Sequence, residues 1–474
     1  MKGNIILAWR NIWRNKRRTL ITAASIFFAV FFALIMRSYQ LGSYSNWIEN
    51  LVKTYTGYIQ IQEKNYWADK TLENSILWNN NLDSLLSTKS NTMLWTPRLE
   101  WGALASNGQQ TKLAVVIGID VERESSFSNP KEKIVIFRFN EAIVEQLKMN
   151  DIPENVVKEL SKISNVSYSS EEKFRYELQN IIGENETELY FEKIKSATAF
   201  QCDFLSPNDN GVIVADRLAR FLKLNIGDTI VLTGVGFQSQ TAAGKFPVRG
   251  FVKMPNPDLD KALVYVTLAQ AQELFAMQQR ITSVLVSPIN HSDKEVENLK
   301  NFFSENLNDS IYAVKDWKKM NDLVLRQIEA DNQSGLISLG LLYLIIGFGV
   351  FGTVLMMTAE RKREFGVMIA IGMQKTKLLV IVTLEMIFIG IIGILAGIVG
   401  SIPIIYWFHI HPIMLTGEMA ASIENYGIEP VMPFAWESGF FINQSFVVIL
   451  IVMAAAFYPI FSITRIKVNK ALRA

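Results

Sequence analysis

The titratable side chain in the most unusual surroundings is Glu385, which lies two turns inside an apolar run that begins at Leu378. A carboxylate inside a membrane is costly and often has a functional role. The alternative is that the helix begins below the bilayer, which leaves Glu385 near the interface and paired with a basic neighbour. Both interpretations are open, and Glu385 is the first candidate functional residue.

Residue patterns typical of enzymes are scarce. The sequence has no G-x-x-x-x-G-K-[ST], so it cannot bind ATP through a Walker-type loop. Its three histidines are His291, His409 and His411, and the last two are weak evidence for a metal because a third ligand is missing. The paired acids are expected to be solvated, and nothing supports nucleophilic catalysis. We therefore expect no catalytic residue, metal or cofactor in this chain.

The most distinctive segment is Glu360-Arg361-Lys362-Arg363-Glu364-Phe365-Gly366, which is followed by apolar residues up to Gly372. An interfacial helix with basic anchors would explain the charges. It would not explain why so many apolar residues are placed in a short loop between two membrane runs. A protein partner would bury them.

Membrane helices must position these residues, because the chain is 49% hydrophobic with a mean hydropathy of +0.17. Four long apolar runs hold most of that character. The first, Thr19–Met36, has 18 residues without a charge, just enough to span a bilayer as a helix. A cleaved signal peptide is the alternative, but the run ends in Leu34-Ile35-Met36-Arg37 without a small-residue cleavage site. An uncleaved anchor is favoured.

Lysine and arginine set the orientation. Basic residues precede the first run, separate the second from the third, and follow the fourth, so all three segments are expected to be cytoplasmic. Residues 41–334 hold 38 acids against 31 bases, a net charge of −7, while the remainder carries +9. Because the bases lie at the ends of the apolar runs, nucleic-acid binding is a poor explanation. The one cysteine, Cys202, excludes an intramolecular disulfide.

The predicted fold class is a membrane protein with four transmembrane α-helices and a large α+β extracytoplasmic domain between the first two. Strand-like and helix-like segments alternate through that domain, and residues 129–200 are predicted to be a helical insertion or subdomain. The predicted order is a cytoplasmic in-plane helix (1–18), a first span (19–40), the extracytoplasmic domain with its stalks (41–334), a second span (335–359), a cytoplasmic loop (360–377), a third span (378–408), an outer loop (409–444), a fourth span (445–464) and a cytoplasmic tail (465–474).

The segment before the first run has its own pattern. One helical face carries Ile5, Ile6, Trp9, Ile12 and Trp13, and the bases Arg10, Arg14 and Arg17 lie elsewhere. Tryptophan and arginine at this spacing favour a helix that lies in the headgroup layer. A simple basic flank with aromatic anchors is the alternative.

The segment from Glu360 to Gly400, ERKREFGVMIAIGMQKTKLLVIVTLEMIFIGIIGILAGIVG, resembles the signature of the FtsX/MacB-like permeases of ABC transporters. The chain's start, AWRNIWRNKRRTLIT, and its end, from Tyr458-Pro459 to Arg473, resemble the same family. Gly118-Ile119-Asp120-Val121-Glu122-Arg123-Glu124 is similar to an element of the lipoprotein-releasing (LolC/LolE-type) permeases, although Val121 stands where that family often has proline.

The resemblance implies a non-catalytic permease of the bacterial inner membrane, with both termini cytoplasmic and the large domain periplasmic. Such a permease would pair with a second permease copy or paralogue and with two copies of an ABC ATPase that binds ATP and Mg. The expected ATPase-coupling residues are Glu360, Arg361, Arg363, Glu364, Phe365, Gly366, Ile369, Ile371, Gly372 and Lys375. The coupling helix is expected over residues 364–377.

Other partners implied by the resemblance are membrane lipids, a lipoprotein cargo and a periplasmic carrier. An acyl-chain cavity would be lined by Phe27, Phe28, Phe31, Phe32, Met36, Leu342, Ile346, Phe348 and Phe351, although aromatic spans usually just face bilayer lipid. Lipoprotein extraction is the leading functional prediction. MacB-like efflux or FtsX-like signalling is the first alternative, and a receptor or anchor without an ATPase is the second.

Overall fold

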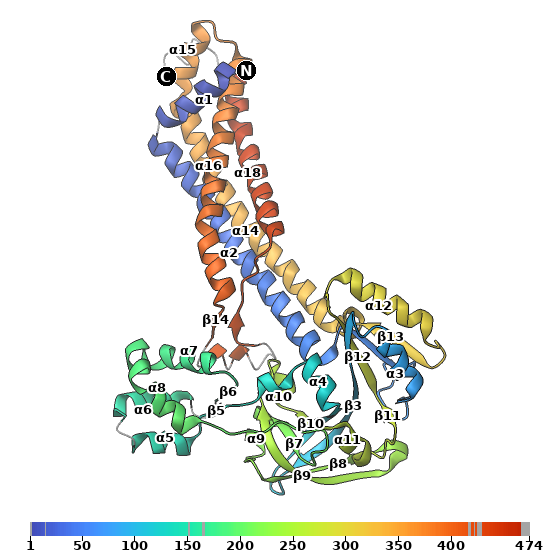
Figure 1. Cartoon of the computed structure of the whole chain (residues 1–474). Helices are drawn as coiled ribbons and strands as arrows, with labels where there is room; N and C mark the ends of the chain where they lie inside the picture. Colours follow the sequence, from blue (N-terminus) through green and yellow to red (C-terminus); the bar gives the residue numbers. More distant parts are fainter. Residues whose placement is uncertain are drawn as a thin grey trace. The chain divides into compact units, whose positions relative to one another are not determined.

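The computed structural model describes residues 2–14, 16–149, 152–163, 166–415, 419–420, 422–423 and 429–465, which form two compact units (Figure 1). The helical unit comprises Met1–Asn46, Leu323–Met414 and Val431–Ala474, and the α/β domain comprises Trp47–Asp322 and Leu415–Pro430. The predicted tail beyond Arg465 lies outside the described residues.

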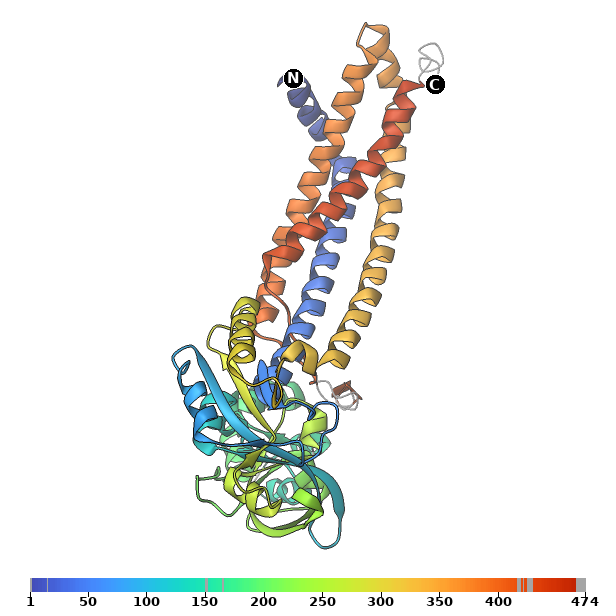
Figure 2. The same cartoon turned by 90° about the vertical axis from the view of Figure 1, so that its right-hand side faces the viewer.

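Four helices of the described chain are long and apolar enough to cross a membrane: α2 (Lys16–Leu51), α14 (Asp322–Glu360), α16 (Lys375–Ile410) and α18 (Ser438–Thr464). They run side by side, and the N-terminus lies at the same end as the last residue of α18 (Figure 2). Because the α/β domain is inserted in the chain between α2 and α14, the predicted fold class is confirmed. A short strand pair, β14 (Ile413–Met414) with β15 (Val431–Met432), links α16 to α18.

Small residues let α16 approach its neighbours closely. A Cβ added at Gly397 would lie 2.7 Å from Val30 Cβ of α2, and one added at Gly393 would lie 2.6 Å from Ile26 Cβ. Helices in lipid associate through such close packing because the surrounding acyl chains supply no hydrophobic drive. The predicted third span, 378–408, is longer in the structure and continues as one helix through Pro403.

The loop between the second and third spans is mostly helical. After α14, a helix α15 (Lys362–Ala370) forms, and Gly372 reverses the chain with φ +103° before α16 begins. Glycine adopts that left-handed conformation without the steric cost of a side chain. The predicted coupling helix over 364–377 is therefore wrong in its bounds, because Gly372 ends it and Lys375 to Lys377 already belong to α16.

One nine-stranded sheet organises the α/β domain, in the order β13-β1-β12-β3-β4-β10-β7-β9-β8. Strand β8 also pairs with β3, so six strands close on themselves around a core that includes Leu99, Ile117 and Phe251. The strands are β1 (Ile59–Glu63), β3 (Met93–Ser106), β4 (Thr111–Ile119), β7 (Val212–Ala215), β8 (Thr229–Val235), β9 (Thr241–Val252), β10 (Leu263–Thr267), β12 (Ser283–Pro288) and β13 (Tyr312–Asp316). A smaller pair joins β2 (Ile76–Leu77) to β11 (Arg280–Ile281).

Helices complete the domain around the sheet. They are α3 (Asn80–Ser87), α4 (Val121–Phe127), α9 (Asp216–Phe221), α10 (Pro257–Asp260), α11 (Leu268–Leu274), α12 (Asp293–Asn306) and α13 (Trp317–Met320). A π-helical turn, Val52–Thr56, joins α2 to β1. Residue Cys202 packs against the main core, and the backbone N–H of Phe251 donates to its Sγ at 3.5 Å.

Residues 129–200 form a part of the α/β domain with a core of its own. Four helices, α5 (Glu141–Lys148), α6 (Glu154–Leu160), α7 (Glu171–Ile182) and α8 (Glu184–Thr198), accompany the strand pair β5 (Phe137–Arg138) and β6 (Ser167–Tyr168). The ring of Phe174 stacks on Phe137 at 4.6 Å between centroids. A hydrogen bond from Ser167 Oγ to Asp216 Oδ1, 2.7 Å, ties this part to α9, which follows β7.

Candidate functional site

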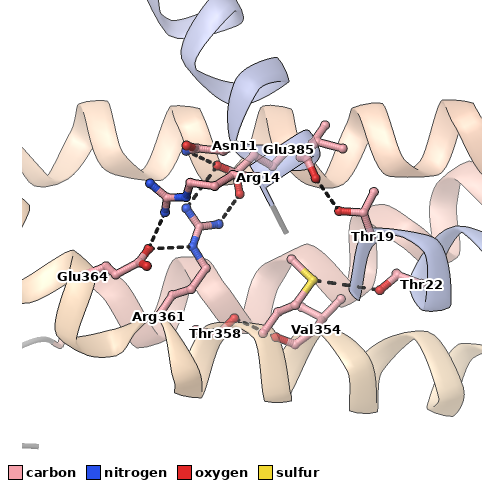
Figure 3. A network of polar contacts seen from close by, with 11 residues as sticks. Asn11, Arg14, Thr19, Thr22, Val354, Thr358, Arg361, Glu364 and Glu385 are labelled. Carbon is pink, nitrogen blue, oxygen red and sulfur yellow. Dashed lines mark hydrogen bonds and ion pairs between the residues drawn. The ribbon is translucent and has the colours of Figure 1, made fainter. Parts of the chain in front are cut away.

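A buried ion pair joins the second and third membrane helices at the α15 end of the helical unit. The guanidinium of Arg361, the residue between α14 and α15, donates to both carboxylate oxygens of Glu385 on α16 (Figure 3). The Nη2 to Oε1 distance is 3.3 Å, and the two side chains are only 7% and 3% exposed. The two charges stabilise each other, because either one buried alone would be strongly destabilised by the loss of its hydration.

The N-terminal helix α1 (Lys2–Arg14) adds a second layer to this pair. The amide Nδ2 of Asn11 donates to Glu385 Oε1 at 2.7 Å. Helix α1 then ends, and Thr19 Oγ1 at the start of α2 donates to the backbone oxygen of Ile12 at 2.9 Å. Asn11 of α1 and Arg361 of the α14–α15 junction therefore both donate to one carboxylate on α16 (Figure 3).

The network continues outward through Glu364, in the first turn of α15. Its Oε2 accepts from Arg14 Nη2 at 2.8 Å and from Arg361 Nε at 3.4 Å. Glu364 and Arg14 are about half exposed, so the chain of charges runs from the buried pair to solvent. A carboxylate at a helix N-terminus also stabilises that helix through its dipole.

Small cavities flank the buried pair. One of about 10 Å³ lies toward α1, lined by Asn11, Thr19 and Met357 among others. Another of about 10 Å³ lies toward α18 and includes Pro459 and Thr358 in its wall. Each has roughly the room of one water molecule beside polar groups. Water-sized spaces therefore lie on two sides of the buried pair.

Helix α15 has two faces. Its inner face holds Phe365, which is buried against Leu378, Val382 and Ile463. Its outer face exposes Val367 and, just past the helix end, Ile371, whose side chain is 82% exposed. An exposed apolar stripe on a short helix is typical of a surface that another protein covers.

The structure divides the predicted coupling residues by position. Arg361, Phe365 and Gly366 are buried, and Ile369 is half-buried against the same cluster, so these four hold α15 on the helical unit. Lys375 donates to the backbone oxygen of Thr464 at 3.0 Å. The outward-facing members are Glu360, Arg363, Glu364, Ile371 and Gly372.

The predicted acyl-cavity residues are brought together only in part. Rings on α2 stack along the helix, with Phe27 to Phe31 at 5.4 Å and Phe28 to Phe32 at 6.0 Å between centroids. On α14, the ring of Phe351 contacts Tyr458 of α18 instead, at 5.7 Å. Of the others, Ile346 packs into the core of the helical unit, Phe348 is exposed, and Met36 and Leu342 are half-buried.

Sequence reasoning missed Asn11 and Arg14 as partners of Glu385 and Glu364. A signal for Asn11 was present, because position 11 lies on the same helical stripe as Ala8 and Ile12, which are buried. A polar residue on a buried stripe needs a hydrogen-bond partner. The partner itself, 374 residues away, could not be inferred from that spacing.

Residues 336–468 match the model of a known protein family, described as FtsX-like permease C-terminal. This part of the chain is similar to an FtsX-like permease domain. The matched residues include α15, Arg361 and Glu385, whereas Asn11 and Arg14 contact them from outside the matched range. The polar network around Glu385 and Glu364 is therefore completed by the N-terminal helix.

Two curated relatives match about half of the chain at low sequence identity. The chain is 21% identical over 207 residues to the lipoprotein-releasing system transmembrane protein LolC of Xylella fastidiosa, covering 42% of this chain and 49% of that one. It is 23% identical over 236 residues to the ABC transporter permease YtrF of Bacillus subtilis, covering 48% and 51%. The chain thus spans about half the length of the relatives it matches.

Among solved structures, the periplasmic region of MacB from Actinobacillus actinomycetemcomitans is similar at 13% identity and a TM-score of 0.32. The aligned part covers 59% of this chain and 96% of that one.

Proposed function

We propose that this chain is the permease subunit of an ABC transporter, driven by ATP and Mg bound to a separate ATPase chain. The FtsX-like domain and the names of the LolC and YtrF relatives support the transporter class. The observation that carries the coupling role is α15, a short helix held from inside by Phe365 and the Arg361 to Glu385 pair, with Val367 and Ile371 exposed on its other side. A docked ATPase would cover that outer side.

The proposed setting is the bacterial inner membrane, with both termini and α15 in the cytoplasm. The support is the bias of lysine and arginine toward the segments before α2, around α15 and after α18. A second permease copy or paralogue completes the proposed dimer, with two ATPase copies on the cytoplasmic side.

In the proposed mechanism, the ATPases pull on α15 when they close over ATP. Because Arg361 links α14 directly to Glu385 of α16, displacement of α15 reaches both helices. Helices α2 and α14 are also joined farther along, where Arg37 Nη1 of α2 donates to Asn332 Oδ1 of α14 at 2.7 Å. Arg37 Nη1 also donates to Gln40 Oε1 within α2, at 2.7 Å. Both helices continue into the α/β domain, at Leu51 and from Asp322, and would act as stalks that move it.

Co-purification of an ATPase tests the docking surface. An aspartate at Ile371 places a charge in the proposed interface, so Ile371→Asp is expected to abolish recovery of the ATPase. The matched control is Leu323→Asp, because Leu323 is also 82% exposed but lies at the opposite end of α14. The control is expected to retain the ATPase.

Two further changes act on the same surface by other means. Glu364→Lys reverses the charge in the first turn of α15, and Gly372→Trp blocks the left-handed turn. If the ATPase remains bound in Ile371→Asp and in both of these variants, the docking assignment is wrong. If no ATPase accompanies even the wild-type chain, a receptor or membrane anchor becomes the better proposal.

For cargo, we propose lipoproteins that are extracted from the inner membrane and handed to a periplasmic carrier. Support comes from the LolC relatives and from the exposed rings of Phe28 and Phe32 on α2. Depletion of the protein should reduce lipoprotein release into the soluble carrier fraction. Unchanged release would favour a MacB-like efflux or FtsX-like signalling permease.

A further inference from the structure

The N-terminal helix α1 presents three different faces to its surroundings. The first packs on the helical unit through Ala8 and Ile12, both buried, and places Asn11 on Glu385. Ile12 is predicted from the sequence to lie with the tryptophans, but it belongs to the packed face. The other two faces of α1 are mostly exposed.

The second face is apolar and exposed. Ile5, Ile6, Trp9 and Trp13 each have about half of their surface accessible. Trp9 and Trp13 meet edge to face at 6.0 Å, and Trp9 also contacts Phe388 of α16 at 5.8 Å. Tryptophan in this arrangement is typical of the layer between headgroups and acyl chains.

The third face is basic. Arg10 and Arg14 lie one turn apart on α1, and Lys16 and Arg17 follow at the start of α2, all exposed. Within the part of the chain that the structure describes, Arg10, Lys16 and Arg17 make no ion pair, whereas Arg14 pairs with Glu364. Residues 1–18 contain six lysines and arginines and no acid. This face has the charge to bind an anionic surface.

We propose that the basic face of α1 binds the phosphates of anionic phospholipids, and that such a headgroup competes with Glu364 for Arg14. The exposed tryptophans beside the basic face favour a lipid surface over an acidic protein, because they would insert next to the bound headgroups. Each lysine or arginine near an anionic surface strengthens binding by about fivefold.

The competition gives lipid a route to the coupling helix. Glu364 Oε2 is shared between Arg14 at 2.8 Å and Arg361 at 3.4 Å. A phosphate on Arg14 frees Glu364 to bind Arg361 more closely, in competition with Glu385. Anionic lipid would then alter how firmly α15 is held. This second step rests on the proposed coupling function, whereas lipid binding by α1 does not.

Tryptophan quenching in vesicles tests the binding step without an ATPase. The full chain is reconstituted in mixed phosphatidylcholine and phosphatidylglycerol vesicles with bromine on the acyl chains of one lipid or the other. Brominated phosphatidylglycerol is expected to quench α1 more strongly than brominated phosphatidylcholine at equal fraction. The Trp9→Phe/Trp13→Phe variant supplies the background from the other tryptophans. Equal quenching by the two lipids overturns the proposal.

Charge variants test which residues carry the preference. Arg10→Gln/Arg17→Gln is expected to lower the preference for phosphatidylglycerol by at least about fivefold. The matched control, Lys362→Gln/Arg363→Gln, removes two exposed bases of the same end and is expected to keep it. If Arg10→Gln/Arg17→Gln keeps the preference, the lipid assignment is wrong. It is also wrong if the two lipids quench the wild type equally and this variant instead loses a bound ATPase, because the basic face would then bind protein.

Glu364→Gln tests the competition in the opposite direction. Without the carboxylate, Arg14 is free for a headgroup, so the preference for phosphatidylglycerol is expected to rise, by up to about fivefold. A gain cannot be explained by misfolding. An unchanged preference in Glu364→Gln would overturn the competition step and leave the binding step to the quenching result.

Discussion

Two buried arginine–glutamate pairs, one in each unit, use the same groups in opposite ways. In the α/β domain, Arg98 of β3 binds Glu124 of α4, and in the helical unit Arg361 binds Glu385. Both are two-pronged contacts of a guanidinium with a carboxylate, the arrangement with the strongest geometric specificity. What separates them is the surroundings.

The α/β pair is closed. Glu124 also accepts from Thr96 Oγ1 at 3.2 Å and from Ser128 Oγ, and Arg98 Nη1 donates to the backbone oxygen of Tyr55 at 2.6 Å. Burial alone would raise the pKa of Glu124, but the charge and hydrogen bonds of Arg98 hold that pKa below its usual value. The Arg361 pair is open, because it continues through Glu364 and Arg14 to solvent and is flanked by small cavities.

The comparison teaches that a buried ion pair takes its role from its neighbours. A closed pair fixes one arrangement of strand, helix and the turn at Tyr55, and so belongs to the fold. An open pair has alternative partners within reach, and so suits a junction that changes state. Variants of the closed pair are expected to change the free energy of unfolding more than variants of the open pair.

The largest effect is expected from Arg98→Met, which leaves Glu124 buried without its partner. Such a change costs about 3–5 kcal/mol. Thermal melting of the purified chain in detergent, followed by proteolysis of the α/β domain, measures it. The double variant Arg98→Met/Glu124→Met removes both charges and should recover much of the loss. If Arg98→Met is as stable as the wild type, the closed pair does not stabilise the α/β domain and the two pairs do not differ in this respect.

Asp260, in α10 of the same domain, is a buried carboxylate with a longer contact to an arginine. Arg217 Nε lies 3.6 Å from its Oδ2, and burial, with the charge of Asp216, raises the pKa of Asp260 to about 7. The pKa of Asp260 is higher in the folded chain than the value of about 3.9 expected in the unfolded chain. Its contribution to the free energy of unfolding is therefore fully present below about pH 3.9 and is lost as the pH rises through about 7.

Asp260→Asn should therefore raise the melting temperature of the α/β domain at pH 8, by the equivalent of about 2 kcal/mol, and have little effect near pH 4. The amide oxygen can still accept from the backbone N–H of Met254, now at 2.9 Å from Asp260 Oδ1. Melting curves across this pH range measure the difference. A gain of equal size at both ends of the range would contradict the raised pKa.

Arg361→Met is expected to cost less than its α/β counterpart, about 2 kcal/mol, because Asn11 and water-sized cavities can still solvate Glu385. Its functional effect should be larger, with loss of ATP hydrolysis coupled to the permease. Lys362→Met, which changes an exposed neighbouring base outside the predicted coupling residues, is the matched control. Equal stability losses at Arg98 and Arg361 would remove the distinction between closed and open.

The smallest effect is expected from Asn11→Ala, about 1–2 kcal/mol, since one neutral donor to a charged acceptor is lost. Its melting temperature should fall slightly, while coupled ATP hydrolysis changes more than stability does. If Asn11→Ala leaves coupled hydrolysis unchanged, α1 is a support for Glu385 and not part of the coupling network.

Periodicity predicted much of the fold. The sequence pattern predicts a helix over residues 293–306, and this helix is α12. It also shows a β-branched run at residues 112–119, which is β4 with one residue added. Strand β3 was missed because Pro97 and Gly102 interrupt its pattern, although both are tolerated in this strand. The closure of β8 onto β3 depends on strand twist and long-range pairing, which no local pattern carries.

The site was predicted as separate parts. Composition marked Arg361 as a loop residue and Glu385 as an intramembrane acid, but their pairing depends on how α15 and Gly372 fold the intervening chain back. The apolar residues of the loop were predicted to face a partner. Phe365, Met368 and Ile369 instead pack inward, because residues three or four apart on a short helix fall on one face.

The one cysteine of the chain, Cys202, is expected to react slowly with thiol reagents. Burial raises the pKa of the Cys202 thiol to about 11, so at neutral pH almost none of it is thiolate, the form that reacts with alkylating and oxidising reagents. A cysteine placed on α1 or at Ile371 would be far more nucleophilic by comparison. Probes attached there could report the opening and closing of the Arg361 junction while the native thiol stays unlabelled.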